Sequence, residues 1–209
     1  MAIAYDTSWN WWATTWTTHT WSHTCSWTDR MLIVSHYNPQ GTDIVTGVTY
    51  NWVSMTRVAF LSVTGVDAIW LYYLLNPSTG ANNVVVTTST SVTAYSDSTS
   101  YTWVGGFDTS VTNWPTSTTS MTTSITTWRD NCWLVWSFRS LSSSATAWTA
   151  TTFRSWVNAS MEIWDSNGAK TPAWSYSLIV NCSPATTMWH IVASIYPKLA
   201  NTWNFFMFF

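Results

Sequence analysis

Residues 45–56 read VTGVTYNWVSMT, and this stretch decides the fold. Two runs in which apolar and polar residues alternate flank the pair Asn51-Trp52. Alternation with a period of two is typical of a β-strand with one buried face, and two such runs joined by two residues are typical of a β-hairpin. The stretch therefore predicts an antiparallel hairpin with Asn51 and Trp52 at its turn.

The same pattern recurs along the chain. Short runs rich in Val, Ile, Thr and aromatic residues alternate with turn signals, such as Asn38–Gly41 and Asn76–Gly80. No stretch keeps an apolar period of 3.6 residues over three helical turns, so we expect almost no helix. The prediction is an all-β fold, a two-sheet antiparallel sandwich with jelly-roll-like connections. The expected strands are residues 20–26, 30–37, 45–51, 53–62, 68–76, 82–90, 92–102, 121–127, 132–140, 149–156, 159–165, 174–182 and 187–196.

The chain of 209 residues is long enough for one sizeable domain. We expect residues 1–19, a low-complexity run of Ser, Thr and Trp, to be a flexible N-terminal segment, and residues 20–209 to form a single β-sandwich. The first residues lack the basic and apolar regions of a secretory signal. No window has the roughly 18 apolar residues that a membrane span needs. Residues 204–209 (NFFMFF) indicate a last strand, buried in the core or added to a neighbour's sheet.

Charged residues make up 8% of the chain, against about 25% in an ordinary soluble domain. The polar surface must therefore come from Ser, Thr and Asn, which favour strands and turns over helices. A net charge of −2 provides no basic surface for nucleic acid or for an anionic membrane. Weak repulsion between copies favours assembly.

Tryptophan is the anomaly of the composition, because the chain has 19 tryptophans and only 7 glycines. Asn51-Trp52 stands where Asn-Gly is favoured, since both central residues of a type I′ turn need a positive φ. That conformation strains a bulky residue. Trp70 and Trp133, in contrast, lie in strand interiors and look native. Other tryptophans at turn-like positions are Trp27, Trp114 and Trp174.

Two interpretations follow. In the first, many of these tryptophans are glycines in the native protein, because UGA encodes glycine in some bacterial lineages and their phages and tryptophan under another code table. In the second, the protein is truly rich in tryptophan and stacks sugars or packs into a filament.

Several segments resemble a family of known sequences. These are residues 45–56, 70–86 (WLYYLLNPSTGANNVVV), 101–104 (YTWV), 130–135 (DNCWLV) and 170–176 (KTPAWSY). They are similar to a broad family of uncharacterised β-sandwich proteins, jelly-roll-like or concanavalin-like, in phage and environmental bacterial sequences. The resemblance covers about residues 20–196 and implies a surface or virion-associated structural role, with no active site to transfer. Where the family pattern has glycine after Asn51, Thr102 and Ala173, this chain has tryptophan.

The residues that could carry chemistry form no strong constellation. His23 and Cys25 would share one face of a strand, with His19 nearby, but zinc needs about four ligands and no complementary set follows. The carboxylates are dispersed, and no Gly-x-Ser-x-Gly motif precedes a helix. The three cysteines are expected as buried thiols, with a Cys132–Cys182 bridge as the alternative. We therefore expect no enzyme activity, no metal site and no cofactor.

The sequence predicts a non-enzymatic structural or adhesive module, part of a virion tail or capsid surface or of a cell-surface assembly, located outside the cell or on the virion. The expected partners are further copies of the chain or other structural subunits, and cell-surface glycans are a further option. The alternative function is a carbohydrate-binding module that stacks sugars on exposed aromatic residues. The candidate stacking residues are Trp11, Trp12, Trp103 and Trp114.

Overall fold

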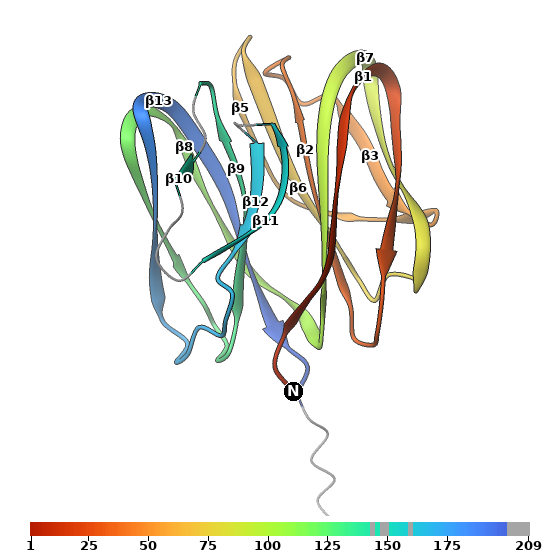
Figure 1. Ribbon diagram of the computed structural model, residues 1–209, viewed down its shortest axis with the longest axis vertical. Helices are drawn as coiled ribbons and strands as arrows, with labels where there is room; N and C mark the ends of the chain where they lie inside the picture. Colours follow the sequence, from red (N-terminus) through yellow and green to blue (C-terminus); the bar gives the residue numbers. More distant parts are fainter. Residues whose placement is uncertain (143–144, 147–150, 159–160, 200–209) are drawn as a thin grey trace, which may run out of the picture.

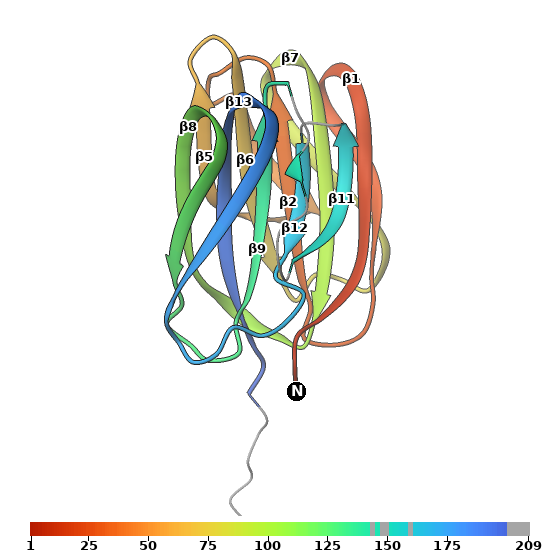
Figure 2. The same ribbon diagram turned by 60° about the vertical axis from the view of Figure 1, so that its left-hand side comes forward.

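The computed structural model of the chain consists of strands and their connections (Figures 1 and 2). It describes residues 1–142, 145–146, 151–158 and 161–199, and no helix occurs in these ranges. Two antiparallel sheets pack together, so the predicted all-β sandwich is confirmed. The strands are β1 (Ala4–Cys25), β2 (Met31–Asn38), β3 (Val45–Tyr50), β4 (Val53–Ser54), β5 (Thr56–Val63), β6 (Asp67–Leu75), β7 (Gly80–Thr102), β8 (Val104–Thr126), β9 (Trp133–Ser140), β10 (Ala145–Thr146), β11 (Thr152–Asn158), β12 (Met161–Asp165) and β13 (Ser175–Pro197).

The first sheet has the strand order β4-β3-β7-β2-β6-β5, with β1 paired to β7. The second has the order β10-β13-β9-β12-β11, with β8 paired to β13. Strands β3 and β4 pair through Tyr50 and Val53, which leaves Asn51 and Trp52 as a two-residue turn. Both turn residues have a positive φ, of 47° and 62°. The hairpin predicted from residues 45–56 is therefore confirmed.

Four strands, β1, β7, β8 and β13, are 22 or 23 residues long, against a mean of about 5–6. Figure 1 shows β1 and β7 rising together, bending over at the top and descending again. One part of β7 pairs with β3 and a later part pairs with β2. Shifts of register in the β1–β7 ladder accompany the bend, as expected because bulges bend strands. Each sheet is thus folded over into two limbs.

The structure differs from the sequence predictions in these long strands. Residues 1–19, expected as a flexible segment, lie mostly in β1, which pairs with β7 from Ala4 to Cys25. Residues 82–90 and 92–102 belong to one strand, and β8 begins at Val104, although only residues 121–127 were predicted there. The reason is that backbone hydrogen bonds between long Ser/Thr-rich strands need no apolar alternation, which is the signal that sequence reasoning uses.

Strands β2 and β9 are buried on both faces. Met31 and Ile33 of β2 belong to a central core shared by the two sheets, whereas Leu32 and Val34 belong to a core inside the first sheet. In β9, Val135 faces the central core and the alternate residues face a third core inside the second sheet. The molecule therefore has three apolar layers, one between the sheets and one between the two limbs of each sheet.

In the described residues, the second sheet repeats six of the seven strands of the first. Strands β8, β9, β10, β11, β12 and β13 take the places of β1, β2, β3, β5, β6 and β7. Tyr5 pairs with Tyr101, and Phe107 pairs with Ile195, which gives shifts of 102 and 94 positions. The same shifts relate the pair His19–Val86 to the pair Met121–Val180 at the far end of the ladders. The chain is an internal duplication of one folded-over unit.

Equivalent hydrogen bonds support the duplication. Asp6 Oδ2 accepts from the Ser26 backbone N–H at 2.8 Å and from Ser100 Oγ at 2.8 Å. Asp108 Oδ2 accepts from the Trp128 N–H at 3.0 Å and from Ser194 Oγ at 3.1 Å. These residues are related by the same shifts of 102 and 94 positions. Each unit therefore has an equivalent aspartate that accepts the same two hydrogen bonds.

We expect Asp6→Ala and Asp108→Ala to lower the free energy of unfolding by similar amounts, about 1.5–3 kcal/mol each, because each removes hydrogen bonds to a charged acceptor. Urea unfolding followed by fluorescence checks this. Lys198→Ala, which removes a surface ion pair with Asp29, is the control, with an expected loss of at most about 1 kcal/mol. A large effect at one aspartate and none at the other would contradict the equivalence.

Candidate functional site

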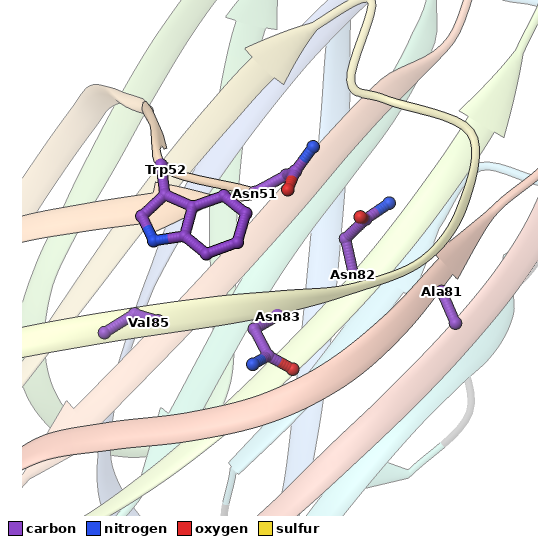
Figure 3. Close-up of a pocket in the computed structure, with 6 residues that line it drawn as sticks. All are labelled: Asn51, Trp52, Ala81, Asn82, Asn83 and Val85. Atoms are coloured by element: carbon purple, nitrogen blue, oxygen red, sulfur yellow. The ribbon is translucent and has the colours of Figure 1, made fainter.

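A hollow of about 290 Å³ lies between the β3–β4 turn and the start of β7. Figure 3 shows the Trp52 indole beside β7, with Asn51, Asn82 and Asn83 close to it. The indole is 91% exposed. Ala81 and Val85 complete the lining.

Buried Tyr50 positions this hollow from beneath. Its hydroxyl accepts a hydrogen bond from Asn82 Nδ2 at 3.3 Å and lies 3.0 Å from the Gly80 carbonyl oxygen. Asn51 Nδ2 donates to Ser78 Oγ at 3.1 Å, and the Asn51 backbone N–H donates to the Asn83 carbonyl. The turn and the start of β7 are thus held together, and the amide groups lie at defined places.

The six lining residues include no titratable group, so this hollow provides no acid or base. An exposed indole beside three amides suits a neutral polar ligand that can both stack and form hydrogen bonds. Trp52 is the only aromatic residue in the lining. Any stacking function of this hollow therefore depends on that one side chain.

The predicted stacking residues are not gathered in this hollow. Trp114 is exposed on β8, whereas Trp11 is half-buried on β1, where its ring stacks on Trp21 at 6.2 Å. Trp103 is half-buried in the β7–β8 connection, and the Trp12 side chain lies outside the described residues. Sequence reasoning treated Trp52 as a turn anomaly and missed its exposure beside Asn82 and Asn83, which come from a distant strand.

Two further surface hollows also contain exposed tryptophans. The first lies where β1 of one unit meets β11 of the other, between Trp9 and Phe153. The second lies between Trp128 and Trp174, near the end of β8 and the start of β13. Each of these three hollows therefore contains at least one exposed tryptophan.

The His19, His23 and Cys25 side chains are all buried. His23 Nδ1 lies 2.9 Å from Ser98 Oγ, and Cys25 belongs to the core of the first unit. Within the described ranges, no three His, Cys, Asp or Glu side chains are arranged to hold a metal. The three cysteines are free, so the alternative of a Cys132–Cys182 bridge is wrong.

Among the described residues, the hydrogen bonds between histidine and serine lie in the interior. His36 Nδ1 lies 2.9 Å from Ser96 Oγ, and both residues are fully buried, so no substrate can reach them. Burial lowers the pKa of His36 to about 3 and the pKa of His190 to about 4. These imidazoles are neutral structural groups in the folded chain.

A polar seam runs between the two units. Ser35 and Ser137, equivalent residues of β2 and β9, lie 2.5 Å apart across it. Arg139 of the second unit donates to Asp67 Oδ2 at 2.6 Å and to the Tyr37 hydroxyl at 3.0 Å, both in the first unit. The Tyr101 hydroxyl of the first unit donates to Asp165 Oδ2 of the second at 3.1 Å.

Asp97 is a buried acid of this seam with a raised pKa. Its complete burial raises its pKa to about 8, with a further increase from the nearby Glu162 carboxylate, whereas a hydrogen bond from Ser155 Oγ at 2.7 Å lowers it. The two acids come from different units, but both are buried. They are a feature of the interior and do not form an open acid pair.

As pH rises from 6.5 to 8, we expect the free energy of unfolding to fall less in Asp97→Asn than in the unsubstituted chain. The Asp97 pKa is about 8 in the folded chain and 3.8 as the reference for the unfolded chain. Between these values the native state retains a proton that the unfolded state has released, so stability falls as pH rises, by up to about 1.4 kcal/mol per pH unit.

Urea unfolding of the two chains at pH 6.5, 7 and 8 checks this. The buried histidines have lowered pKa values and therefore reduce stability only as pH falls below about 6.5, outside the window chosen. Parallel pH profiles for the two chains would contradict the assignment.

Comparison with family models, with curated proteins and with solved structures finds no match to this chain. Among the described residues, no helix has the length and apolar character that crossing a membrane requires.

Proposed function

We propose that the chain is a non-enzymatic structural or adhesive module of a virion surface or of a cell-surface assembly. The observation that carries the proposal is the location of the polar chemistry. Asp97 and Glu162 are buried, and Arg139 and Asp67 form a buried ion pair between the units. With only 8% charged residues, the chain presents mainly Ser, Thr and Asn as its polar surface. The resemblance of its sequence to phage proteins supports the placement on a virion.

The edges of the sheets favour self-association. In the described residues, β1 pairs only with β7 and β8 pairs only with β13. Each of these long edge strands contains a single acidic residue, Asp6 or Asp108, and no Lys or Arg. Soluble proteins usually protect such edges with charges, because an unpaired edge can add a strand from another chain. A second copy of the chain is the partner that these edges suit.

As the alternative function, carbohydrate binding in the hollow between the β3–β4 turn and β7 requires the Trp52 indole as its stacking surface. The β3–β4 turn holds this residue at a φ of 62°, which a bulky side chain rarely adopts. A glycan array tests the alternative directly, and loss of a signal in Trp52→Ala would assign the binding to this hollow.

We expect Thr18→Lys on the edge strand β1 to weaken self-association at least tenfold, because a lysine at an edge opposes strand addition. Its ladder partner Thr87 is the matched position for a control, since both residues are exposed and β7 is flanked on its other side by β3. Thr87→Lys should leave association unchanged. Sedimentation velocity over a range of concentrations gives the readout, and equal behaviour of the two variants would contradict a role for the β1 edge.

Deletion of Phe205–Phe209 tests the predicted contribution of the apolar C-terminal segment, which lies outside the described residues. The sequence predicts loss of folding or of assembly. We expect the deletion to lower the melting temperature by several degrees or to abolish the oligomer, because the sequence predicts that this apolar segment is buried in a core or added to a neighbour's sheet. An unchanged melting temperature together with an unchanged oligomeric state would contradict a role for this segment.

A further inference from the structure

The left-handed backbone region separates the tryptophans into two groups. Every described residue with a positive φ is Gly, Asn, Asp or Trp. Glycine adopts this region without cost, and Asn and Asp tolerate it because their short polar side chains bond locally. Tryptophan has neither property. The three tryptophans in this region are Trp27, Trp52 and Trp103, with φ values of 61°, 62° and 61°.

All three occupy tight connections between strands. Trp52 is the second residue of the β3–β4 turn, and Trp27 lies in the β1–β2 connection with its side chain exposed. Trp103 is the single residue between β7 and β8, and its carbonyl accepts a hydrogen bond from the Lys198 N–H at 2.8 Å. The backbone at these positions is set by the hairpin and ladder geometry, and exposed indoles at Trp27 and Trp52 gain little burial to offset the strain.

The fully buried tryptophans differ from these three in both burial and backbone conformation. Trp70, Trp136 and Trp189 are fully buried, and none of them has a positive φ. The duplication adds an independent comparison, because Trp136 and Trp189 take the ladder places of Val34 and Tyr95 in the first unit. An apolar or aromatic side chain therefore stands at these positions in both units.

One surface tryptophan, Trp174, occupies a position whose equivalent in the first unit is a glycine. Thr127 donates its N–H to the Trp174 carbonyl, and the equivalent pair in the first unit is Cys25 with Gly80. The ladder position of Trp174 thus holds glycine in the other copy of the same unit.

We propose that the native protein carries glycine where this chain has Trp27, Trp52 and Trp103, because UGA codons are read as glycine in the cell that makes it. The translation partner that this implies is a glycine-accepting tRNA that pairs with UGA. Trp70, Trp136 and Trp189 are native tryptophans encoded by UGG. Glycine at the Trp52 position removes the aromatic wall of the hollow in Figure 3 and with it sugar stacking in that hollow. The structural role is independent of this inference, since it rests on the interior and the sheet edges.

The gene and the native protein test the inference directly. We expect UGA at codons 27, 52 and 103 and UGG at codons 70, 136 and 189. Peptide mass spectrometry of protein from the natural source should then find glycine at the first three positions and tryptophan at the other three, which serve as internal controls. UGG codons, or tryptophan in the native peptides, at the first three positions would overturn the proposal.

A second experiment tests the backbone argument in the full chain produced with tryptophan. Glycine and alanine are each introduced at Trp27, Trp52 and Trp103. Both substitutions remove the indole, but only glycine relieves the left-handed strain, so each glycine variant should melt about 2–8 °C above its alanine counterpart.

Trp9 and Trp16 provide the matched control. Both are exposed on β1 and neither has a positive φ, so glycine there should melt at or below the alanine variant, because glycine weakens a strand. Equal melting of glycine and alanine at Trp27, Trp52 and Trp103 would contradict the claim that the fold selects glycine there.

Discussion

Burial of β2 and β9 on both faces is the constraint on which the rest of the structure depends. A strand that is apolar on both faces needs cover on each side. The inner faces of β2 and β9 cover one another across the central core, where Ser35 and Ser137 meet. Their outer faces need a second layer, and the long strands β1, β7, β8 and β13 supply it by bending over into a further limb. The strand lengths and the bulges at the bends follow from this requirement.

The polar seam decides how the two units face one another. Apolar packing alone tolerates sliding, whereas Arg139 bound to Tyr37 and Asp67 does not, because a shift would leave a charge buried without its partner. Asp97 does not place a charge in the interior over most of the neutral range, because its raised pKa keeps the carboxyl group protonated. The chain has few charges, and several of them lie where they fix the orientation of the units.

The interior and the surface of the chain differ in their polar chemistry. The four histidines are buried, as are the acids Asp67, Asp97, Glu162 and Asp165, so these groups are interior features of the fold. The described surface includes the edge strands β1 and β8, each with one acidic residue and no Lys or Arg, and three hollows that contain exposed tryptophans. These edge strands suit a second copy of the chain whatever residue stands at the turns, whereas sugar stacking in the hollow beside β7 depends on Trp52. The identity of this turn residue therefore decides whether that hollow can stack a sugar.

The sequence by itself determined the β class, the Asn51-Trp52 hairpin and the conflict between tryptophan and its turn, because these depend on local alternation and on local φ preferences. It also contains the repeat, visible in Asp6-Thr7-Ser8 and Asp108-Thr109-Ser110, but Ser/Thr-rich strands carry too little pattern for the repeat to be recognised from composition and alternation. Only the tertiary structure decided that most of residues 1–19 form strand, that Trp52 lies beside Asn82 and Asn83, and that Asp97 approaches Glu162. Those outcomes depend on which distant strands pair and which units pack, and ladder hydrogen bonds and core packing between residues far apart in the chain have no local signature.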